Sequence, residues 1–215
     1  MDISPEQIAE NLAAVRARLP AHVTLVAVSK LQPAEAIRAA YAAGQRDFGE
    51  NYVQEWRGKA AALADLADLR WHLIGALQAN KAKYVAGACA LVHGLESAKV
   101  ASELDRRAAA RGALQPILVQ VNVAREPQKG GVAVEELPTL LAELGALPHL
   151  RVAGLMTIPP AEADPRPHFA ALRELAKAHG LAQLSMGMSA DWPLAVEEGA
   201  TLVRVGTAIF GHRHV

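Results

Sequence analysis

The stretch TLVAVSK, residues 24–30, is an apolar run rich in β-branched residues that ends at a charged amine. Such a run predicts a buried strand. Side chains alternate along a strand, so Val26 and Val28 share a face with Lys30. Lys30 is therefore either the point where the strand reaches water or a functional amine at the end of a strand, and the rest of the chain must decide between them.

Seven more strand-like runs follow, with helical segments between them. The eight runs are 24–30, 45–51, 70–76, 90–96, 116–123, 151–158, 181–188 and 201–211. Three of the helical segments, 33–43, 164–179 and 191–198, are each followed by a glycine that can end a helix. Both an open doubly wound sheet and a closed barrel show this alternation, but the count of eight favours a (β/α)8 TIM barrel.

An additional helix precedes the first strand. The sequence SPEQ (4–7) predicts a capping box, with Ser4 as N-cap, Pro5 at the first helical position and Gln7 three residues after the cap. This helix is expected to run to about Leu19. No linker or change of composition divides the chain, so residues 1–215 are predicted to form a single domain.

Composition excludes several classes of protein. The 22 basic and 22 acidic residues cancel, so no global field attracts nucleic acid. The N-terminus lacks the basic region of a signal peptide, and no run approaches the roughly 18 apolar residues of a membrane span. The single cysteine, Cys89, fits a core position in a protein of the reducing cytoplasm. We expect a cytoplasmic protein, a monomer, without a membrane segment.

The eight histidines show neither an HExxH pattern nor the spacing of a zinc site, so no metal is expected. His72 and His93 are interpreted as core or rim groups whose hydrogen bonds are satisfied.

In a TIM barrel the active face lies at the C-terminal ends of the strands. Lys30 is at this end of the first strand, where partial desolvation would lower the pKa of its amine and make it nucleophilic. An amine of this kind is what an imine-forming lysine requires.

The last two strands suggest an anion site. LSMGMSADWP (184–193) places Ser189 just before a short helix, and VRVGTAIFG (203–211) places Gly206 and Thr207 near the end of the eighth strand. A glycine there allows backbone N–H groups to approach a ligand closely. The loops after strands seven and eight are the usual phosphate position in this fold.

Arg204 lies two residues before Gly206 and so points to the same face of the strand. A guanidinium buried inside a barrel requires a partner. Two partners are equally plausible from the sequence: a carboxylate such as Glu50, or a ligand. If the ligand contains a pyridine ring, Arg204 is placed to donate to the ring nitrogen and would weaken the ring as an electron sink.

Several segments together resemble the pyridoxal phosphate homeostasis protein family. They are AVSK (27–30), FGENYVQE (48–55), WHLIGALQANK (71–81), QVN (120–122), QKGG (128–131), GLMTI (154–158), LSMGMSADW (184–192) and VRVGTAIFG (203–211). The resemblance covers essentially the whole chain. It implies a fold-type III barrel, related to the N-terminal domain of alanine racemase, that binds pyridoxal 5′-phosphate.

The resemblance also implies roles for individual residues. Lys30 would form the Schiff base with the cofactor, and Ser189 with the amides of Gly206 and Thr207 would hold its phosphate. Arg204 would face the pyridine nitrogen. Three further residues would line the ring pocket, namely Asn51, Met156 and Met188. Lys129 matches a second lysine that could handle or transfer the cofactor.

Three functions are compatible with these residues, and we expect the first of them. The first is sequestration and delivery of pyridoxal phosphate, with cofactor-requiring apoenzymes as possible recipients and no dedicated turnover. The second is an amino-acid racemase, which needs a second base opposite the lysine. The three tyrosines, Tyr41, Tyr52 and Tyr84, are expected on helices after the first three strands, where none is an obvious second base. The third is a cofactor-free aldolase acting on a phosphorylated sugar.

Overall fold

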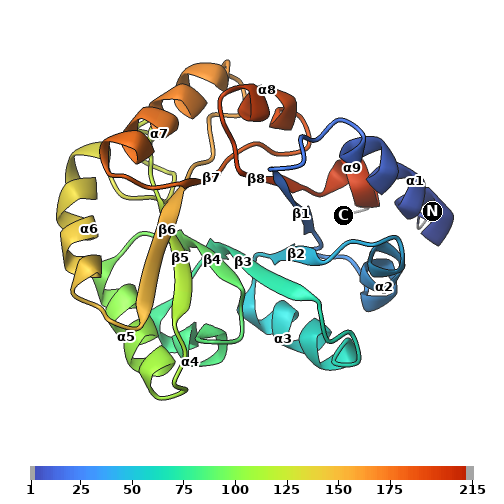
Figure 1. Cartoon of the computed structure of the whole chain (residues 1–215), viewed down its shortest axis with the longest axis horizontal. Coiled ribbons are helices and arrows are strands. Elements are labelled where there is room, and N and C mark those ends of the chain that lie inside the picture. Colours follow the sequence, from blue (N-terminus) through green and yellow to red (C-terminus); the bar gives the residue numbers. More distant parts are fainter. Residues whose placement is uncertain (1–2, 212–215) are drawn as a thin grey trace.

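Eight parallel strands form a closed barrel in the order β1 to β8 in the computed structural model, which describes residues 3–211 (Figure 1). Between β8 and β1, four pairs of residues close the ring, from Thr24 opposite Leu202 to Ala27 opposite Val205. The strands are β1 (Thr24–Val28), β2 (Asp47–Glu50), β3 (Arg70–Ala76), β4 (Leu91–Leu95), β5 (Gln115–Gln120), β6 (Leu150–Met156), β7 (Gln183–Ser185) and β8 (Leu202–Val205). The predicted (β/α)8 barrel is confirmed.

Helices surround the barrel, as Figure 1 shows in a view along the barrel. They are α1 (Pro5–Arg16), α2 (Ala34–Ala42), α3 (Val53–Ala62), α4 (Ala82–Val85), α5 (Ala98–Ala109), α6 (Leu137–Gly145), α7 (Arg166–Ala178), α8 (Trp192–Glu197) and α9 (Thr207–Phe210). Two 3₁₀ turns, η1 (Ala79–Lys81) and η2 (Val134–Glu136), precede α4 and α6. Within the described range, no helix has the length and apolarity to cross a membrane.

The last predicted strand is wrong in its second half. The sequence TLVRVGTAIFG suggests one strand over 201–211, but β8 ends at Val205 and the segment TAIF forms the short helix α9. The chain changes direction at Gly206, whose carbonyl accepts hydrogen bonds from the amides of Ile209 and Phe210. An apolar run cannot distinguish a continuing strand from a buried helical turn.

The additional N-terminal helix is present, with half of the predicted capping box. The Ser4 hydroxyl accepts a hydrogen bond from the Gln7 amide at 3.2 Å. The Gln7 side chain does not return to the cap and instead donates to Glu10 and Asn11. The helix ends at Arg16, three residues before the predicted Leu19.

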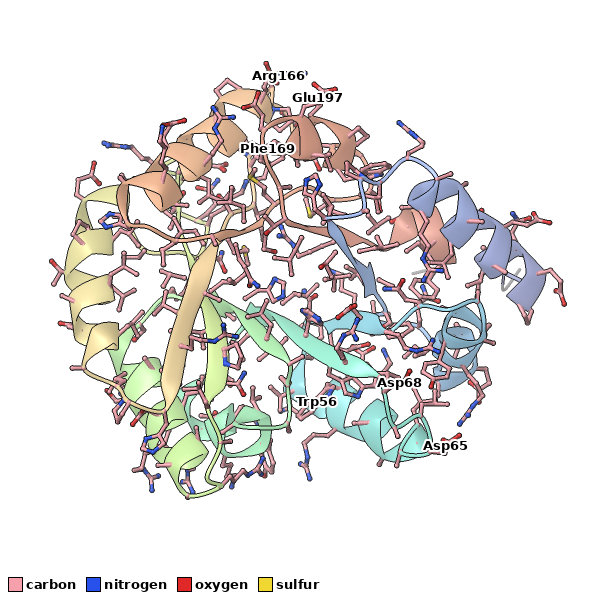
Figure 2. The ribbon with its side chains drawn as sticks, viewed as in Figure 1. Trp56, Asp65, Asp68, Arg166, Phe169 and Glu197 are labelled. Atoms are coloured by element: carbon pink, nitrogen blue, oxygen red, sulfur yellow. The ribbon has the colours of Figure 1, made fainter. Side chains whose placement is uncertain are left out.

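The apolar core has two parts. The larger part lies between the strands and the helices, and Figure 2 shows two of its members, Phe169 on α7 and Trp56 on α3. Cys89 belongs to this part, and burial raises the pKa of its thiol to about 12, as expected for a core residue. The smaller part lies inside the barrel and consists of Val26, Leu91, Leu118, Met156 and Leu202.

A buried ion pair attaches α3 to the strands on which it packs. Lys59 Nζ lies 2.7 Å from Glu50 Oε1 and donates to the Ser29 carbonyl at 2.6 Å. The Ser29 hydroxyl donates to the same Glu50 oxygen at 2.6 Å. Burial raises the pKa of Glu50 above its ordinary value, although the hydrogen bonds from Lys59 and Ser29 oppose the shift. The backbone just before Lys30 is therefore held by charged groups on another element.

We expect Lys59→Met to destabilise the fold by about 3–5 kcal/mol, because it leaves the Glu50 carboxylate buried without a cation. The double variant Lys59→Met/Glu50→Leu should recover much of this loss, since an apolar pair removes both charges. Arg38→Met is the matched control, because Arg38 pairs with Asp65 at the exposed surface and should cost at most about 1 kcal/mol. Urea unfolding measures all three, and a loss below about 1 kcal/mol for Lys59→Met would contradict the interpretation.

Candidate functional site

A cavity of about 300 Å³ opens at the C-terminal ends of the strands. Seven of the predicted site residues line it: Lys30, Asn51, Met188, Ser189, Arg204, Gly206 and Thr207. They come from the ends of β1, β2, β7 and β8 and from the loops that follow. The volume is at the lower end of the range for small-molecule sites.

Lys30 follows the last residue of β1 and is half-buried. The predicted alternation is confirmed, because Val26 belongs to the barrel interior and Val28 lines the cavity beside Lys30. The next residue, Leu31, has a φ of 62°. Its amide donates to the carboxylate of Glu55, which also pairs with Lys59. The turn that carries Lys30 is thus held on both sides by the ion pairs of α3.

Ser189 forms the centre of a group of backbone donors between the ends of β7 and β8. Its hydroxyl oxygen accepts from the Gly206 amide at 3.1 Å and from the Ala208 amide at 3.4 Å. A Cβ on Gly206 would lie 3.2 Å from the Val28 carbonyl oxygen, so a larger residue would press against β1. The sequence predicted the amides of Gly206 and Thr207 here. The Ala208 amide was missed because the helical turn of α9 was taken for a strand.

Arg204 is only 4% exposed and makes its hydrogen bonds with neutral groups. Its two terminal nitrogens donate to the Ser185 hydroxyl at 2.7 Å and to the Thr157 carbonyl at 3.0 Å. Burial lowers its pKa to about 10, so the guanidinium remains a cation at neutral pH. The alternative of an ion pair with Glu50 is wrong, because that carboxylate pairs with Lys59 on the outer side of the barrel wall.

Asn51 reaches the cavity because the next strand allows a close approach. A Cβ on Gly75 of β3 would lie 2.3 Å from the Asn51 carbonyl oxygen, which only glycine permits. The side-chain oxygen of Asn51 is buried and has no hydrogen-bond partner among residues 3–211. A buried acceptor of this kind at a cavity wall is suited to a donor on a ligand.

Two predicted site residues lie elsewhere. Met156 is fully buried in the barrel interior with Leu118 and does not line the cavity. Lys129 does not line it either: its amine donates to the Pro159 carbonyl at 2.8 Å and pairs with Glu126 at 2.6 Å. Pro159 directly follows Ile158, a residue of the cavity wall, so Lys129 lies beside the mouth and not in it.

Other residues of the cavity wall had no distinctive signal in the sequence. Ile74, Ile158 and Val28 make it partly apolar, and Gln32, Ala190 and Gly211 complete it. The isoleucines lie at the ends of β3 and β6, where a strand pattern identifies them only as apolar residues. Sequence reasoning also missed Ser185 and Thr157, which accept hydrogen bonds from Arg204.

The predicted core histidines are confirmed as buried, hydrogen-bonded groups. Nδ1 of His72 lies 2.9 Å from Nε2 of His93, and each ring has a second partner. Among the described residues no group of three or more histidine, cysteine, aspartate or glutamate side chains is arranged to hold a metal ion.

Comparison with known proteins identifies the family. Residues 3–214 match the alanine racemase N-terminal domain. The pyridoxal phosphate homeostasis protein of Pseudomonas aeruginosa is 48% identical, with 96% of each chain covered, and that of Aquifex aeolicus is 46% identical, covering 88% of this chain and 86% of the relative. The structure of PipY from Synechococcus elongatus with PLP bound superposes with a TM-score of 0.88 and 45% identity, covering 95% of this chain and all of PipY. The chain belongs to the pyridoxal phosphate homeostasis protein family, whose barrel is that of the alanine racemase N-terminal domain.

Proposed function

We propose that the protein binds pyridoxal 5′-phosphate in the cavity at the C-terminal mouth of the barrel, and that it sequesters and delivers this cofactor inside the cell. The observation that carries the proposal is the convergence of three chemically different groups on one cavity. They are an amine at Lys30, a set of backbone donors around Ser189, and the buried cation of Arg204. The relationship to PipY, whose structure contains PLP, supports the same ligand here.

The residues present fit this cofactor. Its phosphate is an anion, to which the Ser189 hydroxyl can donate its proton while the hydroxyl oxygen accepts from the amides of Gly206 and Ala208. The buried side-chain oxygen of Asn51, which has no partner in the described part of the chain, can accept a hydrogen bond from a donor on the ring. Ile74 and Ile158 offer apolar surface to an aromatic ring.

When bound, the cofactor supplies a reactive aldehyde. The amine of Lys30 is the group that can condense with it, forming a C–N bond with loss of water. Arg204 contributes a permanent positive charge beside the ring nitrogen, which disfavours protonation of that nitrogen. The site therefore holds the cofactor covalently while weakening its use as an electron sink.

A racemase would need a second acid–base residue opposite Lys30. None of the chain's three tyrosines lines the cavity: Tyr41 donates to Asp68, Tyr84 lies under Arg57, and Tyr52 is 59% exposed. The names of the relatives favour a role in cofactor homeostasis. A cytoplasmic monomer that loads cofactor-requiring apoenzymes remains our prediction from the sequence, as does a part for Lys129 in handling the cofactor.

Absorption spectroscopy tests the role of Lys30. Purified protein mixed with pyridoxal phosphate should develop a visible absorption band that borohydride removes, because reduction of the C–N double bond breaks the conjugation. Peptide mass mapping should place the reduced adduct on Lys30, and Lys30→Ala should show no band. Lys129→Ala is the matched control, because this lysine lies beside the mouth and should leave the band unchanged.

A band of full intensity in Lys30→Ala would contradict the assignment of the amine. Absence of any band in the unaltered protein at saturating cofactor would contradict the proposed function and favour an aldolase-type role for Lys30.

Ligand-binding measurements test the role of Ser189 at the phosphate. Ser189→Ala should weaken binding of pyridoxal phosphate by about tenfold or more, since a hydrogen bond to a charged group is worth roughly 1.5–3 kcal/mol. Binding of pyridoxal, which has no phosphate, should change by less than about twofold. Ser102→Ala, on the exposed surface of α5, is the control variant and should leave both affinities unchanged. Equal losses for the two ligands in Ser189→Ala would show that Ser189 does not contact the phosphate.

A further inference from the structure

A continuous chain of hydrogen bonds crosses the interior of the barrel and ends at Arg204. Arg204 donates to the Ser185 hydroxyl at 2.7 Å, and Ser185 Oγ lies 2.8 Å from Nδ1 of His93. Nε2 of His93 lies 2.9 Å from Nδ1 of His72, and Nε2 of His72 lies 2.9 Å from Oδ1 of Asp47. The chain joins five strands, β8, β7, β4, β3 and β2.

The two ends of the chain carry opposite charges. Arg204 is a cation that can only donate. At the other end, Arg70 pairs with the Asp47 carboxylate at 2.6 Å. Burial opposes the ionisation of Asp47, but the hydrogen bonds from Arg70 and His72 outweigh it and lower its pKa to about 2. Asp47 is therefore a carboxylate at neutral pH and can only accept.

Arg204 can only donate and the Asp47 carboxylate can only accept. When both imidazoles are neutral, each hydrogen bond between these two ends therefore has one possible donor and one possible acceptor. The carboxylate of Asp47 requires a proton on Nε2 of His72, so Nδ1 of His72 accepts from Nε2 of His93. Nδ1 of His93 then accepts the hydroxyl proton of Ser185, whose oxygen accepts from Arg204. Burial above all, with the positive charge of Arg204 nearby, keeps the pKa of His93 well below its ordinary range, which agrees with a neutral ring.

The direction has an electrostatic consequence. Each hydroxyl and N–H dipole in the chain turns its negative end toward Arg204 and its positive end toward Asp47. Within residues 3–211 no carboxylate accepts a hydrogen bond from Arg204, whose other partner is the Thr157 carbonyl; the charge of Asp191 favours the guanidinium without such a bond. The aligned dipoles therefore supply stabilisation that a buried cation otherwise takes from a direct counter-ion.

We propose that Ser185, His93, His72 and Asp47 are positioning residues that hold the Arg204 guanidinium charged and in one orientation toward the ring nitrogen of the ligand. None of the four lines the cavity at the mouth. Two terminal N–H groups of Arg204 donate to Ser185 and Thr157, which fixes the plane of the guanidinium at a residue that also lines the cavity. The part of this proposal that concerns the ligand rests on the proposed function.

The direction of the chain can be tested without any ligand. Nitrogen-15 NMR of histidine-labelled protein at neutral pH should show His72 and His93 as neutral rings protonated on Nε2. Ser185→Ala removes the hydroxyl that donates to Nδ1 of His93 and should shift that nitrogen's resonance. A ring protonated on Nδ1, or on both nitrogens, would overturn the proposed chain.

The positioning role is tested with two ligands. They are pyridoxal phosphate and its analogue in which CH replaces the ring nitrogen. The unaltered protein should prefer pyridoxal phosphate by about tenfold or more, the effect of one hydrogen bond from a charged donor. Ser185→Ala and, from the far end, Asp47→Asn should each reduce this preference by at least about threefold. Leu118→Val is the control, because it removes one methylene from the same interior without touching the chain and should keep the full preference.

An unchanged preference in both variants, with their folding confirmed by circular dichroism, would overturn the positioning role. Failure of the unaltered protein to bind either ligand would instead refute the proposed function. The histidine spectra alone would then test the direction of the hydrogen bonds between Asp47 and Arg204. The preference for the ligand with the ring nitrogen distinguishes a positioning role from a merely structural one, since general destabilisation of the protein weakens the binding of both ligands equally.

Discussion

A closed barrel of eight strands must fill its own interior, and the way this chain does so governs the rest of the molecule. One part of the interior is apolar, with Val26, Leu118 and Met156 fully buried. The other part is the polar chain from Asp47 to Arg204. Buried polar groups are tolerated only when they have hydrogen-bond partners, and Ser185, His93 and His72 each have a partner on both sides. The interior is thereby both a core and the support of the cavity above it.

The residues that line the cavity come from strands that are adjacent in space but distant in sequence. β1 and β8 are neighbours in the closed ring, which brings Lys30 near Gly206 although 176 positions separate them. α3 holds the turn at Lys30 from outside through Lys59, whereas Ser185 holds Arg204 from inside. The amine and the guanidinium are therefore oriented by different polar networks on the two sides of the barrel wall.

The sequence predicted those features that depend on local periodicity. Strand number, the position of Lys30 at a strand end, and the loops after β7 and β8 all follow from alternation and from helix-ending glycines. The sequence did not predict the depth of Met156, because the height of a residue inside a barrel depends on the stagger of all eight strands. It also missed the contact of His93 with Ser185, which are 92 positions apart and meet only when the ring closes.

The filled interior also determines the route by which a ligand enters and leaves the cavity. Fully buried side chains fill the barrel interior beneath the cavity. The site is therefore a pocket that opens at the C-terminal mouth, and not a channel through the barrel. Ile158 and Met188, which line it, are 36% and 38% exposed. A ligand therefore enters and leaves through the same opening, so that entry and release compete for it.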